Sequence, residues 1–284
     1  MNNWSLASPV VNASRPIGVF DSGVGGLTVW RELQRQLPRE SIVYFGDTAR
    51  LPYGDRSREE IVAFGREILH WMSAQGVKMV LVACNTSSAL ALEEIREEFD
   101  IPILGLILPG ARAAVDGGRR RIGTIATPAT VSSHAYQRAI LEIDPQVRVW
   151  EVPCPKFVPL IEASRCDKAR LRAAARTYLE PLRVRKIEAL IYGCTHYPLI
   201  ESILQEILPD VDFIDPARSL VAAVDRELEV LGLKNTGQAR LTRFCVSGAP
   251  GVFARSARRW LGQTPIVEQV SLAAMSTLPL SMEI

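Results

Sequence analysis

The sequence predicts an α/β fold of two pseudo-symmetric, doubly wound domains with mostly parallel sheets. The chain has 284 residues, more than the roughly 100–200 residues of one typical domain. Short β-rich runs alternate with longer helical patterns, and this order favours parallel sheets covered by helices on both faces. Two segments, 80–86 (VLVACNT) and 189–196 (ALIYGCTH), repeat one plan: a buried strand, a cysteine, then polar residues that open a helix.

Hydrophobic periodicity locates the elements of the first part of the chain. Residues 61–75 carry apolar side chains at helical spacing and end before a glycine. A glycine-rich run at 21–26 links the first strand to the first helix. Here we expect strands at 17–20, 42–45, 77–83 and 101–106, and helices at 27–37, 61–75 and 87–99.

The same signals continue to the end of the chain. The β-rich runs are short and apolar, as expected for strands buried on both faces. The segments between them have the 3.6-residue periodicity of amphipathic helices. We expect strands at 121–126, 187–192 and 241–246, and helices at 133–142, 167–183, 200–207, 216–232 and 251–262.

Composition excludes several classes of protein. Apolar residues make up 48% of the chain and charged residues 23%, as in ordinary globular proteins. Thirty-three basic and 31 acidic residues leave a net charge of +2, so no overall field favours nucleic acid or an anionic membrane. Residues 1–14 lack the apolar core of a signal peptide. We expect a cytoplasmic protein with a flexible tail at 1–15 and reduced cysteines.

The five cysteines fall into two groups. None belongs to a CxxC pair, so neither a zinc site nor a disulfide framework is indicated. Cys154, Cys166 and Cys245 have the features of packing residues. Cys84 and Cys194 each follow a strand and open a helix, where the partial positive charge of backbone N–H groups favours a thiolate. Ligands of open α/β sheets bind at such strand ends.

Other polar residues near these positions are candidates for the same site. Residues 21–26 (DSGVGG) lack the spacing of a dinucleotide loop and the lysine of a P-loop. Asp21 is therefore either a helix cap or a carboxylate that faces a ligand. His196 lies two residues after the second cysteine, whereas His70 and His134 have the setting of ordinary helix residues.

Two loops have both a structural and a functional interpretation. Residues 50–54 (RLPYG) form either a simple turn or a rigid loop that presents a phenol and backbone N–H groups. Residues 127–133 (TPATVSS) place hydroxyls where a strand meets a helix, and at least one of these is expected to cap that helix.

Four motifs together resemble those of the glutamate racemases. They are residues 17–29 (IGVFDSGVGGLTV), 44–54 (YFGDTARLPYG), 83–86 (ACNT) and 193–199 (GCTHYPL). They occur in the expected order, and the similarity extends over about residues 16–217. The wider aspartate/glutamate racemase superfamily shares the two cysteines but not the full DSG and PYG pair.

The resemblance implies a reaction and roles for five residues. The family interconverts L- and D-glutamate without a cofactor and supplies D-glutamate for peptidoglycan. Cys84 is implied as the base toward D-glutamate and Cys194 as the base toward L-glutamate. Asp21 resembles the carboxylate that assists the first thiol, and His196 the imidazole that assists the second. Glu162 stands where some members have a further auxiliary acid.

The resemblance also implies substrate contacts, most of them hydroxyls, amides and backbone N–H groups. This sequence has alanine at two positions where the family commonly has glycine, Ala126 and Ala129, and Ser87 where alanine is frequent. The implied contacts are Asp21, Ser22, Pro52, Tyr53, Gly54, Asn85, Thr86, Thr127, Thr130, Thr195 and His196.

The implied site lies in a cleft between the domains. One domain is expected to comprise residues 16–107 with 216–284, and the other residues 108–215. The implied partner is glutamate. The resemblance also allows a homodimer and, since some relatives with an N-terminal extension are activated by a cell-wall precursor, an activator of that kind.

Two bases are needed because one base would mostly return the proton to the face it came from. No pyridoxal lysine motif is recognisable, so oriented donors must stabilise the charge that develops on the substrate. Alternatives stay open: an aspartate or hydantoin racemase of the same superfamily, and a non-catalytic binding protein for acidic amino acids. A cysteine hydrolase built on Cys194 and His196 has poor nucleophile–base geometry.

Overall fold

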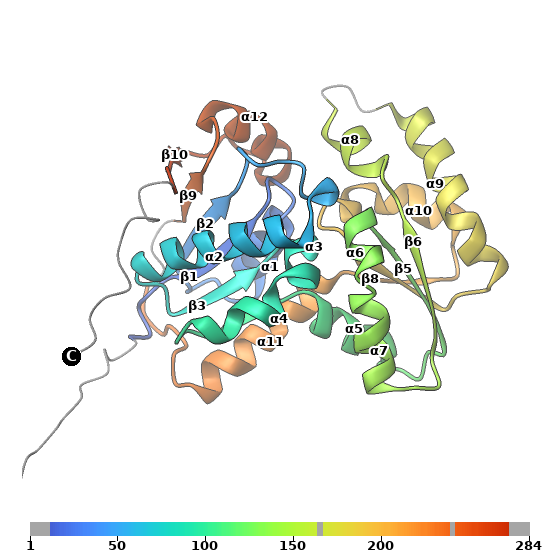
Figure 1. Cartoon of the computed structure of the whole chain (residues 1–284), viewed down its shortest axis with the longest axis horizontal. Helices are drawn as coiled ribbons and strands as arrows, with labels where there is room; N and C mark the ends of the chain where they lie inside the picture. The colour runs from blue at the N-terminus through green and yellow to red at the C-terminus, as the bar shows by residue number, and fades with distance from the viewer. Residues whose placement is uncertain (1–11, 164–166, 239–241, 273–284) are drawn as a thin grey trace, which may run out of the picture.

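A computed structural model describes residues 12–163, 167–238 and 242–272 of the chain. Most of the expected tail and Cys166 lie outside these ranges. The described strands form two sheets in which every pairing is parallel. Figure 1 shows them side by side as two lobes, each with helices packed around its sheet. This arrangement confirms the predicted α/β fold.

The first lobe is built on a six-stranded sheet with the order β10-β9-β2-β1-β3-β4. β2 and β1 lie at its centre, and both of them and the neighbouring β3 are buried along their whole length, as their continuous apolar sequences predicted. The strands are β1 (Ile17–Asp21), β2 (Ile42–Gly46), β3 (Met79–Val82), β4 (Ile103–Gly105), β9 (Arg243–Val246) and β10 (Val267–Gln269).

The second lobe is built on a four-stranded sheet with the order β6-β5-β7-β8. β7 is fully buried, and β5 is buried except at its first residue. The strands are β5 (Arg121–Ala126), β6 (Arg148–Pro153), β7 (Ala189–Gly193) and β8 (Asp212–Ile214).

The helices cover both sheets. Those of the first lobe are α1 (Leu27–Gln36), α2 (Arg58–Ala74), α3 (Asn85–Leu90), α4 (Leu92–Ile95), α11 (Pro216–Val230) and α12 (Pro250–Leu261). Those of the second are α5 (Ile107–Val115), α6 (Pro128–Ser132), α7 (Ala135–Ile143), α8 (Phe157–Glu162), α9 (Lys168–Val184) and α10 (Glu201–Ile207). Single turns of 3₁₀ helix lie at η1 (Tyr53–Asp55), η2 (Arg96–Glu98) and η3 (Tyr197–Ile200).

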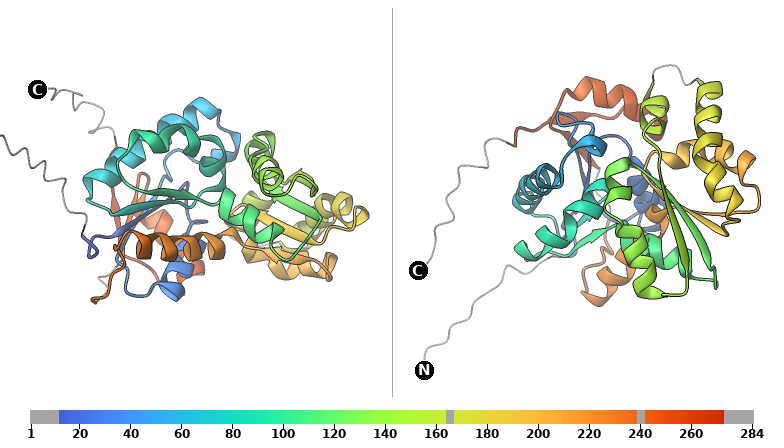
Figure 2. Two further views of the ribbon diagram at one scale, coloured as in Figure 1. Left: turned by 90° about the horizontal axis from the view of Figure 1, so that it is seen from below. Right: turned by 45° about the vertical axis from the view of Figure 1, so that its right-hand side comes forward.

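The chain passes between the lobes twice, from β4 to α5 and from β8 to α11. Figure 2 shows the C-terminal elements beside the N-terminal ones in the first lobe. We therefore keep the expected division into residues 16–107 with 216–284 and residues 108–215 as a proposal. α3 contacts α5, α6 and α7 across the boundary, so its first turn lies between the lobes.

Local capping explains one difference between the expected and the observed helix starts. α2 begins before the predicted residue 61 because Ser57 and Glu60 form a capping box: Glu60 N–H donates to Ser57 Oγ, and Ser57 N–H donates to the Glu60 carboxylate. No helix within the described ranges is long and apolar enough to cross a membrane.

One predicted helix was wrong as a continuous element: the segment 87–99 is divided into α3, α4 and η2. The helix expected at 133–142 is present as α7, which begins at Ala135. The sequence analysis missed the short helix α6 before it, which Thr127 caps. His134 separates α6 from α7 with a left-handed φ of 52°, so it is not an ordinary helix residue. Its imidazole instead pairs with Glu151 at 2.9 Å.

Candidate active site

Both candidate thiols lie at the carboxyl ends of strands, one in each lobe. Cys84 follows β3 and caps α3, and Cys194 follows β7 directly. Cys84 is 5% exposed and Cys194 is 7% exposed. Both line one cavity of about 400 Å³. The repeated plan in the sequence therefore places two thiols, from two different sheets, around one cavity.

Almost all the site residues expected from the sequence line this cavity. Thr130 is the exception: it is fully buried behind Thr127 and Thr86, with hydroxyl–hydroxyl distances of 3.0 and 3.3 Å. The expected residues that line the cavity are Asp21, Ser22, Pro52, Tyr53, Gly54, Cys84, Asn85, Thr86, Thr127, Glu162, Cys194, Thr195 and His196.

The first thiol lies in a buried, acidic setting. Burial and the nearby Asp21 carboxylate raise the pKa of Cys84 to about 11, against a smaller opposing effect of Ser87. The Ser22 hydroxyl lies 3.9 Å from the sulfur. Burial also raises the pKa of Asp21. Cys84 therefore carries its proton at neutral pH, so the thiolate expected at this helix N-terminus was wrong: burial and Asp21 outweigh the donors of the first helical turn.

Asp21 is not the helix cap that the sequence allowed, because Gly26 is the N-cap of α1 and has no side-chain cap. Its Oδ2 accepts hydrogen bonds from the backbone N–H groups of Gly23 at 3.0 Å and Gly26 at 2.9 Å, which holds the glycine turn before α1. The same residue lines the cavity. The carboxylate thus fixes the turn from within the site.

The second thiol belongs to a chain of three groups. Cys194 Sγ lies 3.7 Å from His196 Nδ1, and His196 Nε2 lies 2.8 Å from Glu162 Oε1. Burial lowers the pKa of His196, but its hydrogen bonds to Cys194 and Glu162 outweigh this and raise it to about 10. The imidazole is therefore cationic at neutral pH, and its charge stabilises negative charge on the sulfur.

The glycine turn and α12 hold this histidine in place. A Cβ on Gly25 would lie only 2.6 Å from the His196 ring, so the close approach of the turn requires glycine. On another side, the Trp260 ring meets the imidazole edge-on at 87°, with centroids 5.6 Å apart. The sequence analysis did not predict the contact between His196 and Trp260.

Polar groups from both lobes meet at another wall of the cavity. The Thr86 hydroxyl lies 3.0 Å from the Thr127 hydroxyl across the boundary. Beside them, the Tyr136 hydroxyl donates to Asn85 Oδ1 at 2.7 Å. Burial raises the pKa of Tyr136 well above its ordinary value, so the phenol keeps its proton. Because Oδ1 accepts this bond, the Asn85 amide group remains as a donor.

Asp47 anchors the loop that carries Pro52 and Tyr53. It accepts hydrogen bonds from the Tyr53 hydroxyl, from Arg50 Nε at 2.6 Å and from Ser247 at 2.7 Å. Asp47 is fully buried and did not stand out in the sequence analysis, although it lies within the 44–54 motif. Its position there, between a strand and the loop, was the signal that could have identified it.

A further feature that sequence reasoning missed is a third thiol. Cys154 is 1% exposed and lines the cavity with the other two. Burial raises its pKa far above the ordinary range, so it is a neutral thiol. It is buried and neutral, as a packing cysteine is expected to be, but the sequence analysis did not predict that it lines the cavity.

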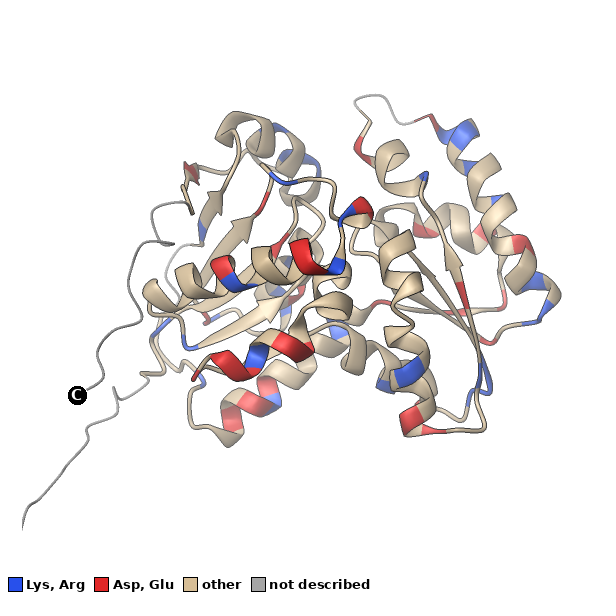
Figure 3. Cartoon of the chain, viewed as in Figure 1, with Lys and Arg blue, Asp and Glu red and all other residues tan. Residues whose placement is uncertain are grey.

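The lining of the cavity contains no lysine or arginine among the residues that the structure describes. Lys, Arg, Asp and Glu lie mainly on the outer helices instead, as Figure 3 shows. Nor do the described histidines, cysteines and acids form a group of three that could hold a metal ion. The cavity therefore offers a carboxylate hydroxyls, amides and backbone N–H groups in place of a cationic side chain.

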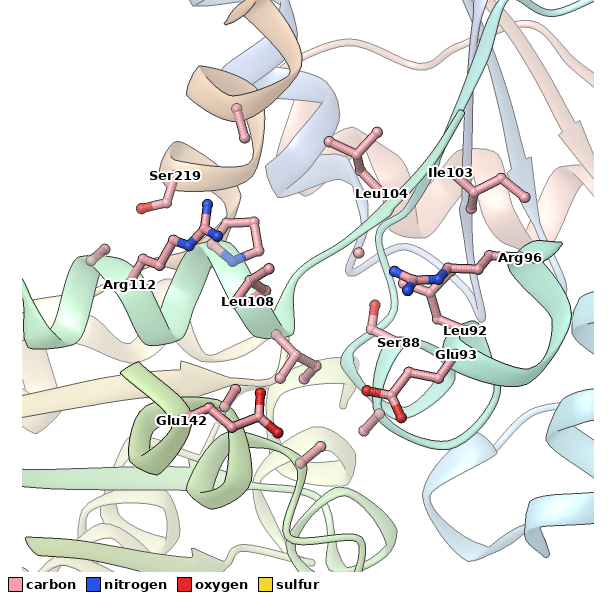
Figure 4. Close-up of a pocket in the computed structure, with 18 of the residues that line it drawn as sticks. Ser88, Leu92, Glu93, Arg96, Ile103, Leu104, Leu108, Arg112, Glu142 and Ser219 are labelled. Carbon is pink, nitrogen blue, oxygen red and sulfur yellow. The ribbon is translucent and has the colours of Figure 1, made fainter. Parts of the chain in front are cut away.

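A second, larger cavity of about 690 Å³ lies beside the two crossovers between the lobes. We call it the crossover cavity; its walls come from α3, α4, η2, β4, α5, α7 and α11. In Figure 4, Arg112 and Ser219 lie on one side of it and Arg96 on the other. Neither Arg96 nor Arg112 forms an ion pair with a described acidic residue.

The chain is similar to known proteins of one family. The family model described as Asp/Glu/Hydantoin racemase matches residues 17–224. A glutamate racemase of Nostoc sp. is 58% identical over 270 residues, covering 95% of this chain and 92% of that protein.

Solved structures agree. The crystal structure of a glutamate racemase from Bacillus anthracis superposes with a TM-score of 0.89 at 39% identity, covering 92% of this chain and 99% of that one. Escherichia coli glutamate racemase, in complex with L-glutamate and the activator UDP-MurNAc-ala, gives 0.73 at 26% identity, with 90% and 98% covered. The chain belongs to the Asp/Glu/hydantoin racemase family and, within it, to the glutamate racemases, which are isomerases.

Proposed function

We propose that this chain inverts glutamate at Cα by moving protons between the substrate and two thiols, Cys84 and Cys194. The observation that carries the proposal is that the two sulfurs, one from each lobe, line the same cavity. Bases on opposite faces of Cα make inversion the ordinary outcome of each proton transfer. A positioned acid or base contributes about 10²–10⁴-fold to a rate.

The charges at the two thiols suit the conversion of L- to D-glutamate. Cys194 takes the α-proton while the His196 imidazolium stabilises charge on its sulfur. The electron pair of the C–H bond stays on the substrate and is delocalised into its carboxylate. Cys84, which carries a proton at neutral pH, gives it to the opposite face. The D-to-L direction is the reverse, with Cys84 as the base.

Asp21, Glu162 and the polar lining support the reaction in this proposal. Glu162 holds the cationic His196 through a 2.8 Å contact, and Asp21 is the buried carboxyl near Cys84. Hydroxyl and amide donors hold the substrate carboxylates and stabilise charge as it develops. These are Ser22, Asn85, Thr86, Thr127 and Thr195, with Thr130 behind them and the loop of Pro52, Tyr53 and Gly54 at the side.

Isotope incorporation tests the proposal directly. In D₂O, each enantiomer of glutamate is given separately to the protein, and deuterium at Cα is followed by NMR and chiral chromatography at early times. We expect deuterium in the product enantiomer and none in the remaining substrate. Deuterium in both enantiomers from the start would indicate one base that serves both faces. A binding protein would give no exchange at all.

The alternative substrates are tested on the same cavity. Aspartate is shorter by one methylene, and a pocket commonly discriminates one methylene by only about 10–200-fold. Following loss of optical activity for glutamate, aspartate and a hydantoin therefore measures a ratio. We expect glutamate to give the highest kcat/KM, and a higher value for aspartate or hydantoin would overturn this assignment.

We also propose that the product serves peptidoglycan synthesis in the cytoplasm. Depletion of the protein in its host should stop growth with loss of cell shape, and D-glutamate in the medium should restore it. Growth that continues without D-glutamate would contradict this role.

A nucleotide-sugar activator is a further part of the proposal. The Escherichia coli relative binds UDP-MurNAc-ala, and the crossover cavity offers Arg96 and Arg112 to an anionic group between the lobes. If such a ligand acts here, UDP-MurNAc-ala will raise kcat, and Arg112→Gln will weaken the effect. Unchanged rates at saturating ligand would exclude it.

The homodimer remains a prediction, and analytical ultracentrifugation would measure the oligomeric state that tests it.

A further inference from the structure

Ser87 has a buried hydroxyl group that stabilises no part of the fold through a hydrogen bond. The residue is 1% exposed, and its Oγ has no hydrogen-bond partner. Leaving a buried polar group unpaired is unfavourable, and such groups in native structures call for an explanation. Since Ser87 does not line the 400 Å³ cavity, direct contact with substrate is not that explanation.

The position of Ser87 in α3 points to the first thiol. Cys84 is the N-cap of this helix, which makes Ser87 the third helical residue. A side chain at that position reaches back toward the N-cap residue, and the backbone N–H of the same residue faces the N-cap side chain. Both the N–H and the hydroxyl of Ser87 act to lower the pKa of Cys84. The serine thus has two donor groups near this sulfur, and neither forms a hydrogen bond with it in the structure.

The neighbouring Ser88 shows what a structural serine looks like here. It is also buried, at 5% exposure, but its hydroxyl donates to Val82 O at 3.0 Å and accepts from Leu106 N–H at 3.3 Å. These bonds join α3 to the end of β3 and to the residue before α5. The two adjacent serines therefore differ in one respect: only Ser88 is satisfied by the folded chain.

We propose that the Ser87 hydroxyl is held in reserve for the Cys84 thiolate, to which it donates a hydrogen bond whenever that sulfur has lost its proton. A neutral thiol is a weak acceptor, whereas a thiolate accepts a strong, charge-assisted bond. The inference rests on the proposed two-thiol reaction, in which Cys84 becomes a thiolate each time it gives its proton to Cα. The preorganised donor then lowers the energy of that state.

The other groups that face Cys84 raise its pKa or are uncharged hydroxyls. Asp21, at the end of β1, raises its pKa, and so does negative charge on Cys194 from the second lobe. The Ser22 hydroxyl, 3.9 Å from the sulfur, is placed to accept from the neutral thiol. The phenols of Tyr44 on β2 and Tyr53 in η1 stay protonated because burial raises their pKa, and they donate to Gly23 O and Asp47 instead. Ser87 is therefore the donor on α3 that opposes the effect of Asp21.

Alkylation of Cys84 tests the inference without racemisation. In a Cys194→Ala background, the rate of iodoacetamide modification at pH 9 is followed by peptide mass mapping, which separates Cys84 from the other cysteines. Losing a hydrogen bond to a charged group should raise the pKa of Cys84 by about one to two units. A smaller thiolate fraction slows alkylation, whereas the greater nucleophilicity of a more basic thiolate offsets part of that loss. We therefore expect the rate to drop about 3- to 15-fold in Ser87→Ala.

Ser88→Ala in the same background is the matched control. It should leave the alkylation rate unchanged but lower the stability to urea, because it leaves two partners unpaired. Ser87→Ala should be as stable as its parent or more so, because it removes an unpaired group. With both thiols present, Ser87→Ala should lower kcat about 10-fold and leave KM nearly unchanged.

Three results would overturn the inference: equal alkylation rates in Ser87→Ala and its parent, an equal loss in Ser88→Ala, or a loss of stability in Ser87→Ala like that of the control. Failure of the two-thiol reaction would appear elsewhere, as racemisation that survives in the Cys194→Ala background.

Discussion

Replacing Glu162 by glutamine removes one charge from the Cys194–His196–Glu162 chain while keeping its shape. The carboxylate lies 2.8 Å from His196 Nε2, and this contact helps to raise the imidazole pKa to about 10. A hydrogen bond to a charged group contributes about 1.5–3 kcal/mol, or one to two pKa units. The Glu162 side chain is 40% exposed and screened by water, so the lower end applies. We expect the pKa of His196 to fall by about one unit.

The sign of the stability effect follows from the raised pKa. A histidine whose pKa is higher in the folded than in the unfolded state, 6.5 ordinarily, stabilises the fold fully below pH 6.5. That contribution is lost as the pH rises toward 10. In Glu162→Gln it should be smaller and end about one unit lower. The alkaline limb of kcat should move down with it, since neutral imidazole no longer stabilises charge on Cys194.

The assay is an NMR titration of the three histidines, together with a pH–rate profile and urea unfolding at pH 6, 8 and 10. His134 and Glu151 provide the control, because this second pair has a 2.9 Å contact outside the cavity and its histidine side chain is 60% exposed. Glu151→Gln should leave the alkaline limb in place. An unmoved limb in Glu162→Gln, or the same movement in Glu151→Gln, would refute the reasoning.

Three further changes have defined outcomes. Tyr136→Phe removes the donor to Asn85 Oδ1 and should raise the KM of both enantiomers about 5-fold. Because the two enantiomers have equal energy, kcat/KM must fall equally in both directions. A change in kcat alone would contradict the positioning role of Tyr136. Gly25→Ala should displace His196 and reduce racemisation by about 100-fold or more, with unchanged circular dichroism of the fold; near-normal rates would show that the turn has room for a Cβ. Lys78→Met leaves the buried Glu40 carboxylate without its cation, with only the Asn235 N–H as a donor, and should cost about 3–5 kcal/mol in urea unfolding with kcat retained. Unchanged stability would mean that water reaches the pair.

The sequence analysis predicted the parts of the fold that depend on strong local patterns. β1, β3, β5 and β7 were expected because fully buried strands have continuous apolar sequences. β6 (Arg148–Pro153) was not expected, since this edge strand is mostly half-buried and its composition is mixed. Three-residue strands such as β8 and β10 carry too little pattern to be recognised.

For the candidate site, too, the sequence analysis predicted some residues and contacts and missed others. Cys84, Cys194 and Asp21 were found because each stands at a strand end, and parallel sheets gather their strand ends at one edge. The contacts of His196 with Trp260 and of Asn85 with Tyr136 join residues more than 50 positions apart, and only tertiary packing determines them. Ser87 differs from Ser88 only in its surroundings, which the sequence does not contain.

The most direct measurement of the two-thiol reaction is deuterium exchange in single-thiol variants. Cys84→Ala and Cys194→Ala are each incubated in D₂O with one enantiomer of glutamate at a time. Cys84→Ala should exchange the α-proton of L-glutamate alone and Cys194→Ala that of D-glutamate alone, with no inversion in either. Inversion that persists in one variant, or one variant that exchanges both enantiomers, would contradict a reaction with one thiol on each face.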